Sequence, residues 1–351
     1  MNIVLVINPG STSTKLAVYH NTQVVAAHTV IHDADSLRQY KHIWDQYTFR
    51  LDAIRSWLQS HTIRPDAIAA MGGLLKPVSG GIYRVNDTMV RDARNNFQGE
   101  HPSNLGCALA SDLAEEFGCD AYIVDPVSVD EFEPLARYSG HPLIERRTLS
   151  HALNIHATAR RAADERDIPL QKSSFIIAHL GGGISVAPVS GGRIIDVNDA
   201  SGDGPFSPNR TGGLPLQPFI SLCFSGKYTE HDLRTMVMGK GGLIAYLETV
   251  SAEEIEKRIA EGDIKAKEIF EAMAYQIAKE IGAMATVLHG NADAIVLTGG
   301  LAGSQLLTGW VTERVKFIAD VIIYPGENEM DALASAVKRV LDGTETAKEY
   351  E

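Results

Sequence analysis

The 351-residue sequence is poor in cysteine, has more acidic than basic side chains, and contains no long apolar run. Its three cysteines, Cys107, Cys119 and Cys223, are odd in number and lack metal or redox spacing, which predicts a reducing cytoplasm. No run reaches the length of a membrane span, and the N-terminus lacks the basic start of a secretory signal. The net charge of −12 argues against a nucleic-acid or anionic-membrane surface.

Three common catalytic signatures are also missing. The chain has no Walker A sequence, no complete G-x-G-x-x-G fingerprint and no G-x-S-x-G nucleophile elbow. The chain therefore lacks the residues that define P-loop and Rossmann enzymes. His179 precedes three glycines, as in some oxyanion loops, but without a nucleophile elbow a hydrolase is disfavoured.

The sequence is rich in a different feature, a glycine turn that follows an apolar strand. Residues 3–7 are an apolar run that breaks into the turn Asn8–Lys15. Such a turn lets backbone N–H groups converge on an anion, and hydroxyl and ammonium groups add donors. An ordinary β-turn is the alternative, because Pro-Gly and Ser-Thr are common in turns. The candidate donors are Asn8, Ser11, Ser13 and Lys15.

The pattern of strand, glycine turn and strand occurs twice. It spans residues 3–30 and returns at residues 175–197, which suggests an internal duplication. Two similar halves that face each other would bring their turns to one cleft, and several such turns suit a polyphosphate nucleotide. The later glycine turns are Gly72-Gly73, Gly181-Gly182-Gly183 and Gly299-Gly300.

Apolar strands alternate with helices along the chain, which places it in the α/β class. The length predicts two domains. We expect them at residues 1–149 and 150–328, with the final helix, about 329–342, packing back onto the first. A helix is predicted over residues 36–60, and we expect its stripe of aromatic side chains to pack in the core rather than to bind a ligand. Further helices are predicted over residues 105–117, 151–166 with Ser150 as N-cap, 263–288 and 329–341, and a long Gly/Pro loop over 199–218.

Four side chains suit phosphoryl transfer, which needs cations, a metal and positioning. Arg210 in the Gly/Pro loop could clamp phosphate oxygens, and His151 opens a helix whose free N–H groups favour an anion. Asp125 and Glu329 could coordinate Mg²⁺. Each has an ordinary alternative, namely a loop ion pair, a surface histidine, a turn cap or a first-turn helix residue.

Ordered motifs along nearly the whole chain resemble the acetate and butyrate kinase family, in the superfamily of acetate kinase, sugar kinases, Hsp70 and actin. The turn Asn8–Lys15 is similar to the first signature of the family and, in its Pro-Gly-Ser-Thr-Ser-Thr form, to the butyrate branch. The other motifs are Gly99–Gly106, Val124–Val127, His151–Asn154, His179–Gly183, Gly204–Arg210, Leu297–Ala302 and Pro325–Glu329.

The resemblance implies duplicated ribonuclease-H-like (actin-like ATPase) domains that face each other across a nucleotide cleft, and a homodimer or higher oligomer. It also implies Mg²⁺- and ATP-dependent phosphorylation of butanoate, or a similar short-chain or branched carboxylate, to an acyl phosphate. Asn8, His151 and Arg210 would contact the transferred phosphoryl group, and Asp125 and Glu329 would organise Mg²⁺. Nucleotide contacts would come from Ser11, Ser13, Lys15, His179, Gly181, Gly182, Gly183, Gly299 and Gly300, and acyl-substrate contacts from His101, Asn104, Gly72 and Gly73.

One position departs from the family pattern. Met71 stands where the family usually has an arginine, so one fixed cation near the carboxylate or phosphoryl group is lost. Lys76, Arg84 or Arg91 could compensate for it. Two alternatives stay open at this stage: a catalytically weakened nucleotide-binding or regulatory homologue, and a sister kinase for acetate or propionate.

Overall fold

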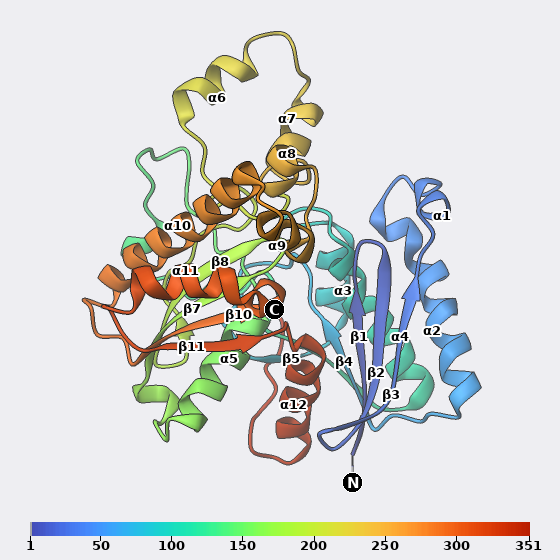
Figure 1. Cartoon of the computed structure of the whole chain (residues 1–351). Coiled ribbons are helices and arrows are strands. Elements are labelled where there is room, and N and C mark those ends of the chain that lie inside the picture. Colours follow the sequence, from blue (N-terminus) through green and yellow to red (C-terminus); the bar gives the residue numbers. More distant parts are fainter. Residues whose placement is uncertain (1) are drawn as a thin grey trace. The chain divides into compact units, whose positions relative to one another are not determined.

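A computed structural model describes residues 2–351, which form two compact units (Figure 1). The first unit contains the chain up to Asp130 together with Asn328–Glu351, and the second is Glu131–Glu327. The chain leaves the first unit once and returns to it at the end. The predicted boundary at residue 149 falls inside the second unit.

The first unit is built on a six-stranded sheet in the order β3-β2-β1-β4-β6-β5. β1, β4 and β6 run parallel, and β2, β3 and β5 are antiparallel to their neighbours. The strands are β1 (Ile3–Pro9), β2 (Ser13–His20), β3 (Gln23–Ile31), β4 (Ala67–Met71), β5 (Ile82–Arg84) and β6 (Asp120–Val124).

Helices cover this sheet because successive residues of its central strands β1 and β4 are apolar and buried. Leu5 and Ile7 of β1 join the core formed with α2 (Tyr47–His61) and α4 (Leu105–Phe117). The last helix, α12 (Glu329–Leu341), packs on β1, β4 and β6. Two short helices, α1 (Ala34–Arg38) and α3 (Asp87–Arg94), and the 3₁₀ turns η1 (Ile43–Gln46) and η2 (Pro102–Asn104) complete the unit.

The second unit repeats the topology of the first. Its five strands lie in the order β11-β10-β7-β8-β9, with β7, β10 and β11 parallel and β8 and β9 antiparallel. They occupy the same relative places as β6-β4-β1-β2-β3, so the predicted duplication is confirmed. The strands are β7 (Ser174–Leu180), β8 (Ile184–Ser190), β9 (Arg193–Ile194), β10 (Ala294–Gly299) and β11 (Val321–Pro325).

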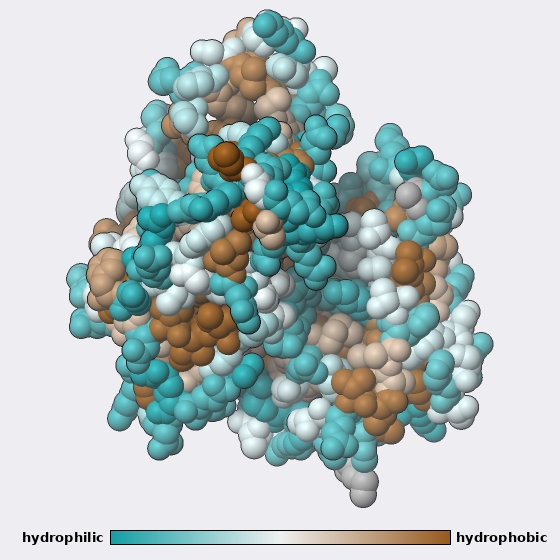
Figure 2. All heavy atoms as spheres, viewed as in Figure 1, coloured by the Kyte–Doolittle hydropathy of each residue, from teal (hydrophilic) through white to brown (hydrophobic). Residues whose placement is uncertain are grey.

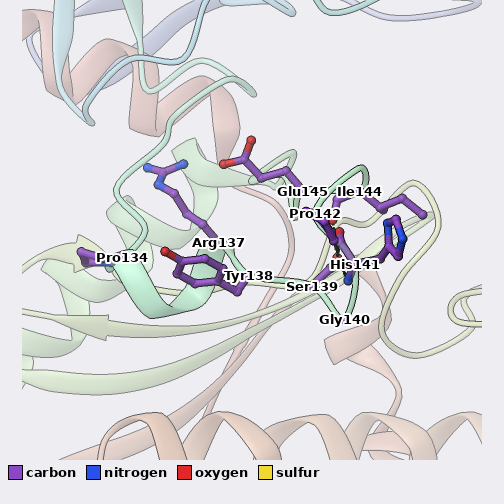
Figure 3. Close-up of a pocket in the computed structure, with 9 residues that line it drawn as sticks. All are labelled: Pro134, Arg137, Tyr138, Ser139, Gly140, His141, Pro142, Ile144 and Glu145. Carbon is purple, nitrogen blue, oxygen red and sulfur yellow. Dashed lines mark hydrogen bonds between the residues drawn. The ribbon is translucent and has the colours of Figure 1, made fainter.

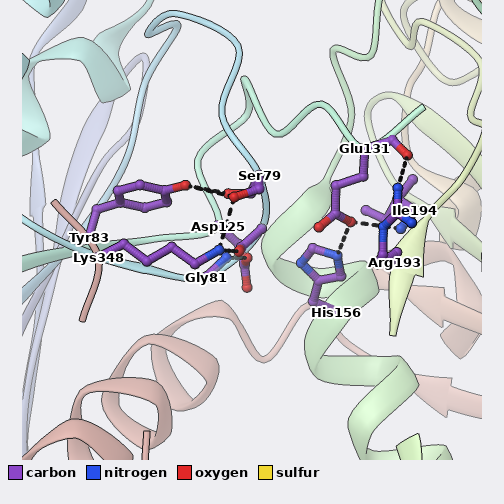
Figure 4. A network of polar contacts seen from close by, with 10 residues as sticks. Ser79, Gly81, Tyr83, Asp125, Glu131, His156, Arg193, Ile194 and Lys348 are labelled. Atoms are coloured by element: carbon purple, nitrogen blue, oxygen red, sulfur yellow. Dashed lines mark hydrogen bonds and ion pairs between the residues drawn. The ribbon is translucent and has the colours of Figure 1, made fainter. Parts of the chain in front are cut away.

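The core of the second unit forms around α10 (Ile264–Val287), which contacts β7, β8, α9 (Ala252–Ala260) and α11 (Gln305–Val315). α5 (Ala152–Glu165) packs on β7 and β10. Glu131 accepts a hydrogen bond from the Ile194 amide (2.8 Å) and contacts the His156 ring (3.1 Å), within this unit (Figure 4). The remaining elements are η3 (Pro134–Arg137), η4 (Leu170–Lys172), η5 (Gly300–Gly303), α6 (Leu216–Cys223), α7 (Glu230–Val237) and α8 (Leu243–Leu247).

Two local predictions are wrong. The helix predicted over residues 36–60 is interrupted between α1 and η1, so its aromatic residues lie in the break (Tyr40), in η1 (Trp44) and in α2 (Tyr47 and Trp57). The N-cap of α5 is His151 rather than Ser150, and the Ser150 hydroxyl has no hydrogen-bond partner within residues 2–351. No helix of the described residues has the length and apolar character needed to cross a membrane.

Candidate active site

Three parallel strands of the first unit end at one edge of its sheet. Asn8 follows Ile7 of β1, the Gly72-Gly73 turn follows β4, and Asp125 follows Val124 of β6. Strand pairing sets Ile7 beside Ala70 and Met71 beside Val124, which brings these three features together. Carboxyl ends of parallel strands are where α/β sheets bind ligands.

Asn8 and Glu329 meet at this edge. The Asn8 side-chain amide donates a hydrogen bond of 2.8 Å to Oε2 of Glu329, the first residue of α12. The apolar face of α12 packs on β1, and this packing sets Glu329 beside the end of that strand. A predicted phosphoryl-contacting residue and a predicted metal-organising residue are therefore direct neighbours.

Asp125 is held in a reciprocal pair with Gly81 (Figure 4). The Gly81 amide donates to Asp125 Oδ1 (2.6 Å), and the Asp125 amide donates to the Gly81 carbonyl (3.0 Å). Lys348 from the C-terminal segment binds the same loop, through Ser79 Oγ (2.9 Å) and the Gly80 carbonyl. One carboxylate oxygen thus fixes the loop geometry.

Asn104 supports the Gly72-Gly73 turn from within the core. It is 1% exposed, and its Oδ1 accepts the Leu74 amide (2.8 Å) while its Nδ2 donates to Asn96 and Gly99. A Cβ at Gly73 would lie 2.5 Å from the Asn104 backbone nitrogen, so only glycine fits. Both polar atoms of the Asn104 amide therefore bind the protein itself.

His101 and Met71 are the remaining features on the predicted acyl side. His101 is exposed, and its Nδ1 contacts Ser103 Oγ at 2.6 Å. Met71 is half-buried at the end of β4. Two of the cations considered as substitutes are engaged elsewhere, since Lys76 pairs with Asp92 (2.8 Å) and Arg84 pairs with Asp120. The third, Arg91, is exposed on α3.

The glycine turns of the second unit also share one edge. β7 and β10 are parallel neighbours, with Thr298 beside His179, so their turns follow adjacent strands. Gly299 has φ 91°, and a Cβ there would lie 2.8 Å from the Leu180 backbone nitrogen. The two turns are thus in contact, and a side chain at residue 299 would prevent that approach.

His151 and His179 stack beside these turns. Their ring centroids are 3.9 Å apart with an interplanar angle of 13°. His151 Nδ1 lies 2.9 Å from Ser185 Oγ, and His179 Nδ1 lies 2.9 Å from Asn154 Oδ1. Ser185 and Asn154 were not among the predicted site residues. Asn154 could have been found, because it lies one helical turn after His151, a spacing that places His151 and Asn154 on the same side of α5.

Arg210 lies beneath the Gly181–Gly183 turn. Its Nη1 donates to the Ala200 carbonyl (2.8 Å), and a Cβ at Gly183 would lie 2.7 Å from its Cζ. Burial lowers the pKa of Arg210, an effect that Asp199 opposes. The sequence therefore needs glycine at residue 183 because the guanidinium fills that space.

His179 is neutral in this environment. Burial, and to a smaller extent the Arg210 charge, lowers the pKa of His179 from 6.5 to about 4. Asn154 Nδ2 donates to the Glu327 carbonyl (2.6 Å), so its Oδ1 is the acceptor and His179 Nδ1 carries the proton. His179 Nε2, which lies 3.0 Å from the Cβ position of Gly181, is then an acceptor.

The turns leave room and polarity for a phosphate-bearing ligand. Gly182 and Gly300 are exposed, and among residues 2–351 no atom outside the neighbouring residues of the chain lies within 4 Å of the Cβ position of Gly300. The buried Asn209 Oδ1, 3.9 Å from the Cβ position of Gly182, has no partner within residues 2–351. An unpaired acceptor beside an open glycine turn suits a ligand that offers a donor, such as a hydroxyl or amino group of a nucleoside, rather than a phosphate oxygen.

The carboxylates suit Mg²⁺ better than a metal with many protein ligands. Among residues 2–351 no three His, Cys, Asp or Glu side chains are grouped to hold an ion. Mg²⁺ binds through one or two carboxylates together with phosphate oxygens and water, and Asp125 and Glu329 offer oxygen ligands of this kind.

A well-defined pocket lies away from these residues. It has a volume of about 520 Å³ and is formed by the loop from Pro134 to Glu145 in the second unit (Figure 3). Arg137, Tyr138 and His141 line it. It contains none of the predicted site residues.

Known proteins resemble this chain over its whole length. The acetokinase family matches residues 141–322. The probable butyrate kinase 2 of Caldanaerobacter subterraneus is 50% identical over 350 residues, with 99% of both chains covered. Butyrate kinase 2 of Clostridium acetobutylicum is 48% identical, with 99% and 98% covered. The crystal structure of Porphyromonas gingivalis acetate kinase matches the fold with a TM-score of 0.79 at 17% identity, covering 96% and 99% of the chains.

Proposed function

This chain belongs to the acetokinase family, and we propose that it transfers the γ-phosphoryl group of ATP to butanoate or a similar short-chain carboxylate. The products are ADP and an acyl phosphate. The observation that carries the proposal is the full-length identity of about half with butyrate kinases. The motif resemblance noted in the sequence is confirmed by it.

The chemistry requires charge neutralisation more than proton transfer. A carboxylate is already ionised at neutral pH, so its oxygen can bond to the γ-phosphorus while the bond to the bridging β–γ oxygen breaks. Two anions must approach each other, and preorganised donors reduce that cost. Arg210 and His151 would donate to the transferred group, and Asn8, oriented by Glu329, would do the same.

The nucleotide side is assigned to the turns of the second unit and to the hydroxyl turn of the first. Gly181, Gly182, Gly183, Gly299 and Gly300 would cradle the phosphates and nucleoside, with neutral His179 supporting the first turn and Ser11, Ser13 and Lys15 as further donors. Asp125 and Glu329 would hold Mg²⁺, which lowers the negative charge of the phosphates when it is bound.

The acyl side is assigned to the Gly72-Gly73 turn and His101. Asn104 would act by holding that turn, because both ends of its amide already bind the protein. Acetate and propionate remain alternative substrates, since one methylene changes discrimination by only about 1–3 kcal/mol in a pocket.

We also propose that the protein is a homodimer that buries the exposed face of α6. This helix has no buried residue, and Leu216, Ile220 and the C-cap residue Phe224 are 71%, 48% and 86% exposed. Hydrophobic side chains are visible on the segment that carries α6 and α7, at the top of the view in Figure 2. Residues 214–240 carry three Lys or Arg and two Asp or Glu, a nearly neutral surface on a chain of net charge −12, which lets two copies approach.

A second element suits an isologous contact. A pocket of about 590 Å³ beside α6 is lined by Phe219, Tyr228 and Val237, among others. An apolar helix next to an apolar pocket is self-complementary, as a twofold interface requires.

The free cysteines Cys107, Cys119 and Cys223 agree with the proposed cytoplasmic location.

The decisive experiment uses purified protein with Mg-ATP, hydroxylamine and straight or branched carboxylates of two to six carbons. Acyl hydroxamate should form and should depend on both ATP and the acid. Comparison of kcat/KM across the acids identifies the preferred substrate. Absence of hydroxamate with every acid, together with intact ATP binding by calorimetry, would favour a nucleotide-binding homologue without turnover, which the comparisons do not favour.

A further inference from the structure

Arg50 is a fully buried arginine in the first unit. It belongs to α2, is 0% exposed, and is among the largest fully buried side chains of the protein. A buried charge is costly unless it is paired and hydrogen-bonded. No carboxylate pairs with Arg50 within residues 2–351, so the benefit of keeping it must lie in its other contacts.

The guanidinium binds the underside of the hydroxyl turn. Nη1 donates to the Ser13 carbonyl and to Thr14 Oγ1, both at 3.1 Å, and Nη2 donates to the Ser11 carbonyl at 3.4 Å. Gln46 Oε1 accepts from Nε (3.1 Å) and Nη2 (2.8 Å). All of these acceptors are neutral oxygens, so the positive charge of Arg50 is not cancelled by its partners.

These contacts fix which way the turn faces. In a trans peptide unit the carbonyl and the following N–H point in opposite directions. The Ser11 carbonyl is drawn to Arg50, so the Thr12 amide is turned away from it. Ser11 and Thr12 are exposed, while Thr14 is buried. The Thr12 amide therefore points away from the buried cation, on a turn whose Ser11 and Thr12 are exposed.

The neighbouring histidine adds no second charge. His32 Nε2 lies 2.8 Å from Thr14 Oγ1, and burial followed by the Arg50 charge lowers the pKa of His32 to about 4. Because a guanidinium can only donate, the Thr14 hydroxyl accepts from Arg50 and can donate its own hydrogen to neutral His32. Asp33 and Asp35, the acidic residues nearest to His32 along the chain, pair with Ser36 and Arg38. Asp45 and Asp52, those nearest to Arg50, interact with the His42 amide and with Arg55.

We propose that Arg50 is a positioning residue that holds the Ser11–Thr14 turn with its donors outward and adds a fixed positive charge beneath the anion that the turn binds. The inference rests on the proposed function only in taking that anion to be the transferred phosphoryl group. A buried charge close to a desolvated anion acts more strongly than one in water. It also requires no rearrangement during the reaction.

Gln46→Glu tests the charge without removing a contact. The variant places a carboxylate on the guanidinium in the same geometry, so the turn stays held while the net charge beneath it is cancelled. We expect an unchanged or higher Tm and a kcat lowered on the order of tenfold. Gln59→Glu, an exposed substitution on α2, the helix that carries Arg50, should leave kcat within about twofold of the wild type.

Arg50→Met tests the positioning. We expect kcat to fall between about tenfold and a hundredfold, with a smaller change in KM for ATP, because the turn loses its support. Arg50→Lys keeps the charge and should retain more activity than Arg50→Met. A wild-type kcat in Gln46→Glu, or equal kcat values in Arg50→Lys and Arg50→Met, would overturn the charge assignment.

The rise in Tm on addition of inorganic phosphate tests the role of Arg50 separately from the proposed kinase activity. If the wild type forms no acyl hydroxamate, the proposed function fails, and the phosphate-dependent rise in Tm then decides the role of Arg50. A rise present in the wild type and in Gln59→Glu but reduced in Gln46→Glu supports it. No rise in the wild type, or equal rises in all three proteins, refutes it.

Discussion

Asn8 Nδ2 lies 2.8 Å from Glu329 Oε2, although 321 positions separate the two residues in the chain. The bond joins the end of β1 to the first turn of α12 within the first unit. It orients an amide toward the strand-end edge and holds a carboxylate in place. Each residue therefore depends on the other for its geometry.

Replacing Asn8 with Asp should disrupt this pair. Two carboxylates would face each other at hydrogen-bond distance, which raises the pKa of the pair above that of the unfolded chain. Its folded state then binds protons more readily, so the variant should lose stability relative to the wild type as the pH rises through the raised pKa. We expect kcat to fall on the order of a hundredfold at neutral pH.

Urea unfolding at pH 5 and pH 8 measures the stability difference for Asn8→Asp. Asn291→Asp, an exposed position in the second unit, is the matched control and should behave as the wild type. A stability gap that does not grow with pH would argue against the direct Asn8–Glu329 contact.

Gly183→Ala should displace the Arg210 guanidinium. The new methyl group would overlap Cζ at 2.7 Å, so either the turn or the arginine must move. We expect kcat to fall about a hundredfold, by loss of a charge donor, with a near-wild-type fold. Gly309→Ala is the control in the same unit, because no described atom outside the backbone of its own helix and its chain neighbours lies within 4 Å of the Cβ position. Hydroxamate rates and circular dichroism of both variants give the comparison.

Protonation of His179 should contribute to acid sensitivity. Burial depresses its pKa from 6.5 to about 4, so the folded protein favours the neutral ring. The resulting stability is present above pH 6.5 and is lost as the pH falls toward 4, by an amount on the order of 3 kcal/mol. His179→Gln should show a shallower fall in unfolding free energy between pH 7 and pH 5 than the wild type. Exposed His231→Gln should not.

Met71→Arg should raise kcat/KM for the carboxylate. The position ends β4, next to the turn assigned to the acid, and a charge-assisted hydrogen bond is worth about 1.5–3 kcal/mol. An increase of about tenfold in kcat/KM is expected. Met71→Leu, which adds no charge, should leave the value unchanged. If both variants match the wild type, the missing arginine does not limit this enzyme.

Phe224→Asp combined with Ile220→Asp should separate the proposed dimer. Charges on the exposed face of α6 would be buried without partners in the interface. Light scattering should give the monomer mass for this variant and the dimer mass for the wild type. Phe97→Asp, at a residue 57% exposed in the first unit, controls for loss of a surface aromatic. A monomeric wild type would refute the dimer.

Local pattern predicted much of the fold. Apolar strands followed by glycine turns marked β1, β7 and β10, because buried strands and turns depend on nearby residues. The repeated order of strands followed from the duplicated pattern. The aromatic spacing of residues 36–60 was misleading, since it persists through a break in the helix at which local hydrogen bonds change.

Contacts between residues that are far apart in the sequence could not be predicted from motifs or residue spacing. Asn8 and Glu329 were each identified from a motif, but no spacing indicates that they touch. Arg50 lies on the same helix face as Ile54, Trp57 and Leu58, so an arginine in an apolar stripe was the available signal. Its acceptors on the Ser11–Thr14 turn come from another segment, and the sequence alone does not reveal them.

The return of α12 to the first unit has a consequence for synthesis of the chain. β1 leaves the ribosome first and α12 nearly last, so the N-terminal sheet stays without its final helix until almost the whole protein has been translated. The partner of Asn8 arrives with that helix. A polypeptide released before residue 329 would lack Glu329, so incomplete nascent chains cannot form the Asn8–Glu329 hydrogen bond.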